Sequence, residues 1–299
     1  MSLTSELDDP HSPISRYLRE RFPHVRELQR RYREPVADAA PLQPAADGTV
    51  AYATLGAAFD WRLRYLLTPA PSLSLAALGG LILGGHLQGL GAELFRVLGG
   101  ANGPSGLDDR QLARACYALA LYTEAYRAGP QPGSRLASLP READLGDLLD
   151  LATAAEVDDL LALTEAARHA LLPVLSARGP ALHIGRVFAG SGHVGGADAD
   201  MIVGGLLVEW KVNLGDRRRD GRRRCALSLD TIHQLLGYLL LDYDDAFQID
   251  ALGVYAARYA YLVTWPLAQL LDELAGAPVD LACARADFRG VAEVTAARY

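Results

Sequence analysis

Lysine is almost absent from this chain of 299 residues: of its 29 basic residues, only Lys211 is a lysine, and the rest are arginine. Arginine is a planar, delocalised fork, whereas lysine is a compact point charge with three donors. A position that keeps lysine where arginine serves everywhere else suggests chemistry that needs the point charge. The alternative is that one lysine survived by chance. The residues around Lys211 decide between these two interpretations.

Cysteine is also scarce, with Cys116, Cys225 and Cys283 far apart in the sequence. This spacing favours a reducing compartment and argues against a structural zinc or an iron–sulfur cluster. The N-terminus has no positive region followed by an apolar stretch, so no signal peptide is indicated. The most apolar run, residues 73–83, is too short to span a bilayer. We therefore expect a soluble, cytoplasmic protein with no membrane contact.

Lys211 stands at the end of an apolar stretch that a pair of glycines divides. The pair Gly204-Gly205 predicts a β-hairpin whose strands cover roughly residues 198–203 and 206–213. Side chains alternate along a strand, so Glu209 and Lys211 share one face. The tryptophan between them faces the other way and is expected to pack in the core.

The first strand of this hairpin carries two aspartates, Asp198 and Asp200, on one face. The antiparallel turn can bring one of them beside Glu209 and Lys211. Two carboxylates and an ammonium would then lie together at one end of a largely buried sheet. Carboxylate oxygens are ligands that Mg²⁺ or Mn²⁺ prefers. The alternative is that these acids are solvated strand and turn residues.

A helix is predicted after the hairpin, with Asp230 as its N-cap. Gln234 and Tyr238 are separated by one helical turn and therefore share a face of this helix. Taken alone, such residues are more often ordinary surface and core positions. Their significance depends on the motif that precedes them.

An aspartate, a short turn and Glu-x-Lys, followed by a helix with Q-x-x-x-Y, together resemble the PD-(D/E)xK phosphodiesterase superfamily, and its RecB-like branch in particular. The match covers roughly residues 182–265, with alanine where the superfamily's name has proline. The resemblance implies an α/β restriction-endonuclease-like core, which is a mixed central sheet flanked by helices. It also implies Mg²⁺- or Mn²⁺-dependent hydrolysis of DNA, in defence against foreign DNA, restriction or repair.

The resemblance also implies a role for each matched residue. The lysine would position the attacking water and offset charge in the transition state. The glutamine and tyrosine would orient the substrate phosphate or the lysine strand. The implied catalytic residues are Asp200, Glu209, Lys211, Gln234 and Tyr238. The implied metal ligands are Asp200, Glu209, Asp198 and the main-chain carbonyl of Trp210.

The superfamily usually adds an acid or a histidine from a helix before the first strand. The two candidates here are Asp60, four residues after Gly56, and Glu165, just before the strands. For each, the alternative is an exposed helix carboxylate. We expect His193, in a glycine-rich turn, to be an exposed loop residue, and His233, at the start of a helix, has no assignable role.

A run of arginines lies between the Lys211 strand and the following helix. Residues 216–224 contain six Arg and two Asp, a local charge of about +4 in a chain of net charge −7. Such a segment can neutralise backbone phosphates without reading sequence, although a solvated loop is the ordinary reading of a charge run. The expected DNA contacts are Arg217, Arg218, Arg219, Arg222, Arg223 and Arg224.

Three regions are expected along the chain: residues 1–50 as a basic amphipathic segment and connector, 51–180 as a helical region, and 181–299 as the nuclease core. The basic helix over 12–33 should be interrupted at Pro23, and the connector covers 35–48. The helical region should break at residues 69–71, 99–106 and 129–140. Strand patterns appear at 181–188 and 251–263, and Pro266 should open a helix over 267–274.

Two other functional classes stay open at this stage. One is a nucleic-acid-binding module that keeps the fold without catalysis. The other is a helical partner-binding protein whose function lies in residues 51–178, with the acidic residues incidental. The sequence is also compatible with a homodimer.

Overall fold

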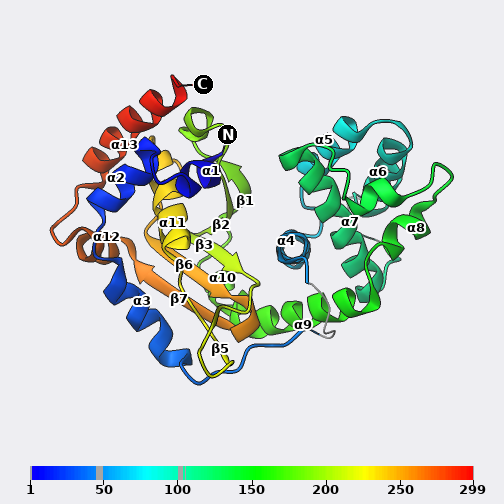
Figure 1. Cartoon of the computed structure of the whole chain (residues 1–299), viewed down its shortest axis with the longest axis horizontal. Coiled ribbons are helices and arrows are strands. Elements are labelled where there is room, and N and C mark those ends of the chain that lie inside the picture. The colour runs from blue at the N-terminus through cyan, green and yellow to red at the C-terminus, as the bar shows by residue number, and fades with distance from the viewer. Residues whose placement is uncertain (1, 45–49, 100–103, 105, 299) are drawn as a thin grey trace. The chain divides into compact units, whose positions relative to one another are not determined.

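The computed structural model describes residues 2–44, 50–99, 104 and 106–298, and shows a mixed α/β protein (Figure 1). These residues form two compact units. The core unit comprises the described residues up to Pro41 and those from His169 onward, and the helical unit is Leu42–Arg168. The division differs from the boundaries expected from sequence, because the N-terminal helices pack against the C-terminal part of the chain.

The described part of the core unit has seven α-helices, one sheet of five strands and a separate two-stranded hairpin. Its helices are α1 (Leu3–Asp8), α2 (Pro13–Arg21), α3 (Val25–Arg33), α10 (Leu172–Ala177), α11 (Leu229–Leu241), α12 (Leu267–Ala275) and α13 (Leu281–Ala296), with 3₁₀ turns η1 (Glu34–Val36), η3 (Ser191–Val194) and η4 (Ala257–Tyr259). Its strands are β1 (Leu182–Val187), β2 (Asp198–Val203), β3 (Leu206–Lys211), β4 (Asp216–Arg217), β5 (Arg223–Arg224), β6 (Ala251–Ala256) and β7 (Tyr261–Pro266).

The helical unit contains no strand among its described residues. Its elements are α4 (Tyr52–Leu67), α5 (Ser74–Leu83), α6 (Gly85–Leu98), α7 (Asp109–Ala128), η2 (Arg135–Ser138), α8 (Leu145–Asp150) and α9 (Ala154–Ala170). The breaks expected at residues 69–71 and 129–140 are confirmed. The expected connector at 35–48 and the break at 99–106 lie partly outside the described residues.

The main sheet has the strand order β1-β2-β3-β6-β7. Neighbouring strands are antiparallel except β3 and β6, which run parallel. Parallel strands need a crossover connection, and α11 lies in the segment that joins β3 to β6. The run at 251–263 therefore contains two strands, β6 and the start of β7. Pro266 closes β7 and is the N-cap of α12 rather than its first helical residue.

The turn between β2 and β3 explains why this hairpin forms where the sequence predicted it. Gly204 and Gly205 have φ angles of 48° and 79°, and two successive residues with positive φ are what a type I′ hairpin turn requires. A side chain at Gly204 would also meet the carbonyl oxygen of Arg178 at 2.0 Å. The second strand ends at Lys211, two residues earlier than expected.

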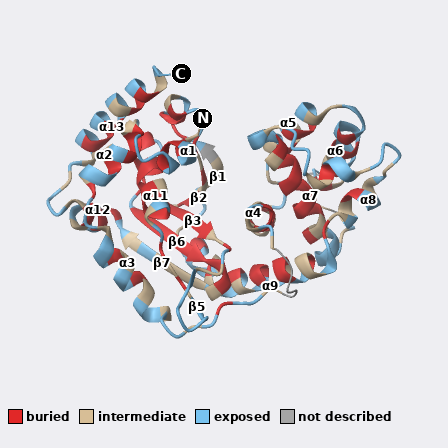
Figure 2. Ribbon diagram, in the orientation of Figure 1, coloured by how far each residue is buried: buried red, intermediate tan, exposed pale blue. Residues whose placement is uncertain are grey.

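Helix α11 lies at the centre of the core unit, where Figure 2 shows buried residues gathered on it and on the strands. Its N-cap is Ser228, whose hydroxyl accepts the Thr231 N–H at 3.0 Å, so the prediction of Asp230 as the cap was wrong by two residues. Asp230 instead supplies negative charge to the first turn, where the helix dipole favours it. Helix α1 packs so closely on α11 that a side chain at Gly237 would meet Leu3 at 2.8 Å.

The basic N-terminal helices were predicted as one segment with a break at Pro23, and the structure confirms the break between α2 and α3. Their apolar face belongs to the same hydrophobic core as α11 and the sheet, through Ile14, Leu18 and Leu28. Burial of that face, rather than the charge on the opposite face, attaches helices α2 and α3 to the rest of the core unit.

The stretch Ala154–Ala177 is the one segment among the described residues that is long and apolar enough to cross a membrane, and 33% of its apolar 18-residue window is buried. A core helix of a soluble protein passes the same test of length and composition. The expectation of a cytoplasmic protein therefore stays a prediction.

Candidate active site

The carboxylates and the lysine of the sequence motif lie at one end of the β2–β3 hairpin. The backbone pairing of β2 with β3 includes Met201 and Val208. Next to Met201 on β2, the side chain of Asp200 contacts β3 instead, because its Oδ2 accepts the Trp210 N–H at 3.1 Å. The side chain of Asp200 thus holds the end of β3 in place of a main-chain partner. This local geometry brings Asp200 to the stretch that carries Glu209 and Lys211.

Glu209 and Lys211 share a face of β3, as predicted, and are in direct contact. Lys211 Nζ donates to Glu209 Oε1 at 2.6 Å, and the Glu209 residue is only 4% exposed. The second oxygen, Glu209 Oε2, is buried and has no hydrogen-bond partner among the described residues. Burying a carboxylate oxygen without a hydrogen bond is costly. At this site only one of the two Glu209 oxygens accepts a hydrogen bond from a described residue.

Helix α11 brings the Q-x-x-x-Y residues to the lysine. Gln234 Oε1 accepts from Lys211 Nζ at 3.1 Å, and Gln234 Nε2 donates to the Tyr238 hydroxyl at 2.8 Å. The amide therefore links the ammonium to the phenol. Because an ammonium can only donate, it selects the amide orientation with oxygen toward Lys211. Tyr238 is buried, and its ring stacks on Phe188 with a centroid separation of 5.6 Å.

The electrostatics of this cluster favour a charged lysine and a neutral tyrosine. Burial alone would lower the pKa of Lys211, but the nearby Glu209 and Asp200 carboxylates outweigh burial and raise it. Burial and the same two carboxylates raise the pKa of Tyr238 well above its ordinary value. Lys211 is thus held as an ammonium and Tyr238 as a phenol throughout the physiological range.

Asp198 and Trp210 occupy less central places than the other predicted metal ligands. Asp198 opens β2, where it pairs with Val187 across the ladder, and it contributes to the raised pKa of Tyr238 less than Glu209 or Asp200 does. The Trp210 side chain is buried, as expected. Among the residues that the structure describes, no three His, Cys, Asp or Glu side chains form a metal-binding group. Glu209 and Asp200 are the carboxylates that act most strongly on Lys211.

The two acids proposed to complete the site both lie in the helical unit. Asp60 forms an ion pair with Arg64 at 2.7 Å, one turn along α4, and both side chains are mostly buried. Glu165 is exposed on α9 and forms an ion pair with Arg168 at 3.6 Å. Each therefore has a partner within its own helix.

The two histidines near the motif differ in their surroundings. His193 lies in η3, and its Nδ1 is 3.3 Å from the Tyr243 hydroxyl. His233 lies on α11 and is buried, and its Nε2 has no hydrogen-bond partner among the described residues. Burial and the neighbouring charge of Arg19 lower the pKa of His233 to about 4. His233 is therefore a neutral core residue at physiological pH.

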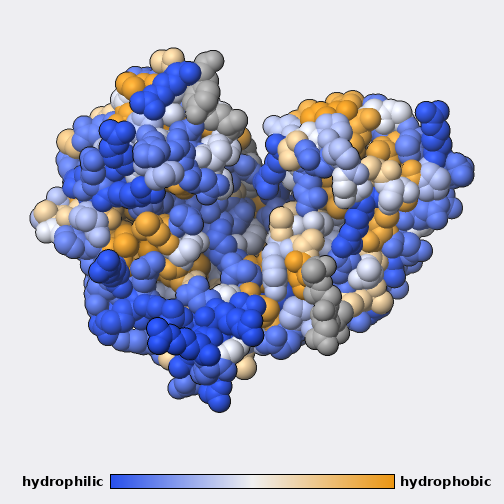
Figure 3. Space-filling model, viewed as in Figure 1, coloured by the Kyte–Doolittle hydropathy of each residue, from blue (hydrophilic) through white to orange (hydrophobic). Residues whose placement is uncertain are grey.

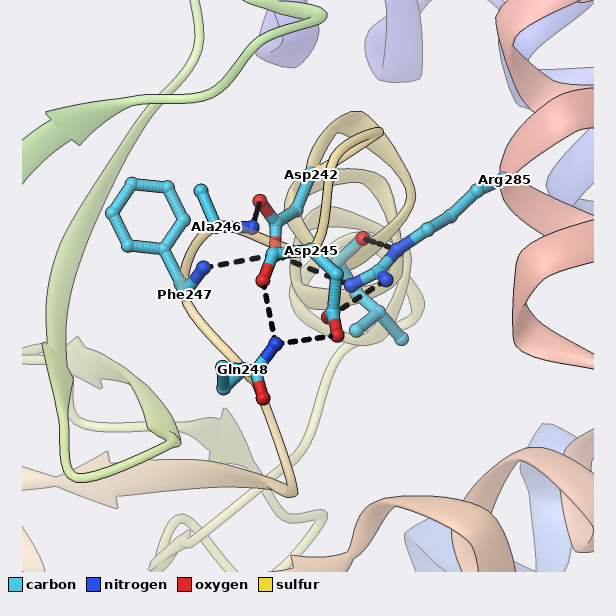
Figure 4. Close-up of polar contacts among 7 residues, drawn as sticks. Asp242, Asp245, Ala246, Phe247, Gln248 and Arg285 are labelled. Atoms are coloured by element: carbon cyan, nitrogen blue, oxygen red, sulfur yellow. Dashed lines mark hydrogen bonds and ion pairs between the residues drawn. The ribbon is translucent and has the colours of Figure 1, made fainter.

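The C-terminal end of α11 is tied to α13 by a buried ion pair, which Figure 4 shows. Arg285 donates to Asp242 at 3.2 Å, to Asp245 at 2.8 Å and to the Leu239 carbonyl at 3.3 Å. Asp242 also accepts the N–H groups of two residues in the turn that follows. Removing one partner of such a buried pair costs roughly 3–5 kcal/mol, so this contact holds the helix that carries Gln234 and Tyr238.

The arginine run forms the β4–β5 hairpin, here called the arginine hairpin (residues 216–224). Figure 3 shows strongly hydrophilic side chains over the part of the core unit where α3 and β5 lie. Side chains of the hairpin line an open surface hollow of about 440 Å³. The lining residues are Arg217, Arg218, Arg219, Asp220 and Arg224. Two arginines form ion pairs within the hairpin, Arg218 with Asp220 and Arg224 with Asp216. The hairpin keeps an excess of positive charge.

A small cavity of about 10 Å³ lies next to Lys211 and is lined in part by residues of β3 and β6. Its lining includes Tyr32 from α3, Thr231 from α11 and Tyr259 from η4. Sequence reasoning did not connect Tyr32 or Tyr259 with the site. The amphipathic pattern of residues 12–33 could have placed Tyr32 in a core, but no local signal points it toward Lys211.

Comparisons with protein-family models, with curated proteins and with solved structures found no match to this chain. The geometry of the candidate site is therefore the basis for assigning a function to this protein.

Proposed function

We propose that this protein is a metal-dependent phosphodiester hydrolase that acts on DNA, with a core of the PD-(D/E)xK, restriction-endonuclease-like kind. The order of elements in the main sheet and its helices, which is β1, β2, β3, α11, β6, β7 and α12, supports this proposal. The contact between the Glu-x-Lys strand and the Q-x-x-x-Y helix supports it as well. The proposal depends above all on Glu209 Oε2, a buried carboxylate oxygen that has no hydrogen-bond partner among the residues described and lies near Asp200 and Lys211.

The donor set fits a divalent cation. Asp200 and Glu209 bring two negative charges to the site, and Lys211 offsets only one of them. The unpartnered oxygen of Glu209 is the kind of ligand that Mg²⁺ or Mn²⁺ takes. Asp200 and Glu209 would hold the ion, with the Trp210 carbonyl and Asp198 as candidates for further contacts. A bound divalent cation supplies Lewis acidity toward a phosphoryl oxygen and acidifies its water.

The residues of the chain divide the remaining work. Lys211, held charged by the two carboxylates, orients the attacking water and offsets negative charge that develops on the phosphate. Gln234 accepts from Lys211 and thereby directs the ammonium. Tyr238 accepts from Gln234 and keeps the amide in that orientation. Of the two roles considered for this pair, positioning of Lys211 is the one these contacts favour.

The arginine hairpin follows the Lys211 strand directly and supplies the contact with the DNA backbone in this proposal. Among the described residues, Arg217, Arg219 and Arg222 form no ion pair, so their guanidinium groups can take phosphates without breaking one. Contacts of this kind are independent of base sequence. The biological setting that we propose is defence against foreign DNA, restriction or repair.

The experiment that tests the proposal combines cleavage and metal binding. The purified protein is incubated with linear, circular and single-stranded DNA and Mn²⁺ or Mg²⁺, with a chelator as the negative arm. In parallel, its thermal unfolding is followed with and without Mn²⁺. An ion at 100 times its Kd stabilises the fold by about 2.7 kcal/mol. We expect Asp200→Asn and Glu209→Gln to remove this stabilisation, and Asp198→Asn to reduce it less.

The matched control is Asp244→Asn, because Asp244 is an exposed acid of the same unit away from the site. This variant should keep both the cleavage and the Mn²⁺ shift. DNA binding without metal-dependent cleavage would support the inactive module instead. If neither DNA nor Mn²⁺ has an effect, the nuclease proposal fails.

A second candidate function, partner binding by the helical unit, has one observation in its favour. Helix α5 contains no charged residue, and it exposes Leu78, Leu81 and Ile82 by 42%, 60% and 47%. Figure 3 shows hydrophobic side chains gathered over this helix. An apolar surface of this kind is typical of contact sites. If this were the function, loss of Lys211 would leave it unchanged.

A further inference from the structure

The segment that follows Lys211 is held by two consecutive side chains from the same end of the sheet, where β6 runs parallel to β3 and ends at Ala256 beside Lys211. Beyond the end of β3, the chain leaves the ladder and leads into the arginine hairpin. Arg258 Nε donates to the Val212 carbonyl at 2.9 Å, and the Tyr259 hydroxyl donates to the Leu214 carbonyl at 2.9 Å. These two residues of η4, here called the η4 clamp, thus hold alternate carbonyls of the connecting segment.

The clamp is built from groups that are costly to bury. Arg258 is only 1% exposed and is among the largest fully buried side chains of the described chain. A buried guanidinium is unfavourable unless its donors are used, and here one of them is used on the main chain. Tyr259 is half-buried, and it lines the small cavity beside Lys211.

Contacts within residues 213–224 also fix the base of the arginine hairpin. Asn213 Oδ1 accepts the Gly215 N–H at 3.0 Å. Gly215 has a φ angle of 69°, and a side chain there would meet the Arg224 carbonyl oxygen at 2.1 Å. The two strands of the hairpin are therefore close at the base, and its path is set by residues 212–215 rather than by its exposed tip.

We infer that Arg258 and Tyr259 are positioning residues that hold the arginine hairpin at a fixed distance from Lys211, so that the protein engages a second phosphate of a polynucleotide while the first is hydrolysed. This inference rests on the proposed function. It adds that the hairpin takes a phosphate other than the one that is hydrolysed, so the protein should prefer a polynucleotide to an isolated phosphodiester. A misplaced hairpin should weaken substrate binding without changing the chemistry at Lys211.

The variant that tests the clamp is Tyr259→Phe, which removes one hydroxyl and keeps the ring. Its matched control is Tyr17→Phe, because Tyr17 donates to the Ala284 carbonyl at 3.2 Å in the same unit, on α2 and α13. A single hydrogen bond contributes roughly 0.5–1.5 kcal/mol, so we expect the KM for DNA to rise roughly 2- to 10-fold in Tyr259→Phe alone. The kcat should follow that of the control.

Two further measurements separate positioning from simple stabilisation. Bis(p-nitrophenyl) phosphate is a phosphodiester with no neighbouring phosphate, so its hydrolysis should be the same in Tyr259→Phe and in the control. In a variant with all six hairpin arginines changed to serine, adding Tyr259→Phe should raise the KM for DNA no further. This non-additivity is expected when two changes act through one contact.

The outcomes are distinct. If the wild type cleaves DNA but Tyr259→Phe and Tyr17→Phe share one KM, the clamp is refuted and the proposed function stands. Equal losses on DNA and on bis(p-nitrophenyl) phosphate would also refute it, because they indicate a structural role. If the wild type neither cleaves nor binds DNA, the proposed function and the clamp fall together.

Discussion

The two units of this protein bury charge in different ways. In the helical unit, the two buried arginines each lie against one acid: Arg62 against Asp109, and Arg64 against Asp60. At the candidate site of the core unit, one ammonium lies near two carboxylates, and Glu209 Oε2 has no hydrogen-bond partner in the part of the chain that the structure describes. Paired charges neutralise each other and serve the fold. An unequal set leaves net charge for a ligand to neutralise. Arg285 of the core unit also lies between two acids, but it donates to both Asp242 and Asp245, whereas Lys211 donates to only one oxygen of the buried Glu209 carboxylate.

The largest effect should come from Lys211, the ammonium that lies near the two carboxylates of the candidate site. Lys211→Ala should lower the rate of DNA cleavage by roughly 10³-fold, with the fold intact by circular dichroism. Lys211→Arg should also be severely impaired, because a planar fork cannot replace a point charge. The comparison variant is Arg62→Ala in the helical unit, which should lose stability and keep its cleavage rate while folded. Full activity in Lys211→Arg would show that the chemistry at this position does not require a lysine.

The next largest effect should be one of stability in the helical unit. Asp60→Ala leaves the buried Arg64 without its ion-pair partner, which should lower the free energy of unfolding by roughly 3–5 kcal/mol. Urea denaturation measures this loss, and the cleavage rate of the folded protein should not change. Glu165→Ala, at an exposed site, should stay within about 0.5 kcal/mol of the wild type. If Asp60→Ala instead abolished cleavage in folded protein, Asp60 would belong to the active site.

A smaller effect should appear on acidification, and it should come from the core unit. The pKa of His233 is lowered from 6.5 to about 4 in the folded state. The unfolded chain therefore binds the proton first, so the stability due to neutral His233 is complete above the unfolded pKa. It is lost as the pH falls from 6.5 toward 4, by up to about 3 kcal/mol.

The measurement is the free energy of unfolding against pH for two matched variants. His233→Gln should flatten the acid limb between these pKa values. His86→Gln should not, because His86 is exposed in the helical unit. An unchanged slope in His233→Gln would place the acid-sensitive group elsewhere.

The smallest effect concerns two basic segments within the core unit. In α3, Arg30 is paired with Glu27 and Glu34, and Arg31 with Glu273. The arginine hairpin keeps unpaired guanidinium groups. Replacing its six arginines by serine should weaken DNA binding roughly tenfold and flatten its salt dependence, since each phosphate contact contributes a slope of roughly 0.9 for duplex or 0.7 for single strands.

The matched variant replaces Arg30, Arg31 and Arg33 of α3 by serine. It should leave the slope of log K against log salt nearly unchanged, because two of these side chains are already neutralised by acids. Salt titrations on two unrelated DNA sequences decide between the segments, since phosphate contacts should weaken equally on both. A flatter slope in the α3 variant alone would make α3 the DNA-binding element.

Much of the site could be predicted because its signals are local. The glycine pair specifies the turn through positive φ, and strand alternation then sets Glu209 and Lys211 on one face. The spacing of Gln234 and Tyr238 likewise fixes a shared helical face, and their hydrogen bond follows. The N-cap was wrong because Ser228 and Asp230 both suit that position, and only the main-chain path chooses between them.

The sequence alone determined the features that follow from a turn or from the repeat of a strand or helix. These are the β2–β3 hairpin, the face of β3 that carries the motif, and the face of α11 that contacts it. Tertiary structure decided which distant residues complete them. Arg258 reaches a carbonyl 46 residues away, Gln234 reaches a lysine 23 residues away, and Tyr32 lines a cavity beside that same lysine. Such contacts leave no local pattern, because they arise when the buried faces of separate elements pack into one core.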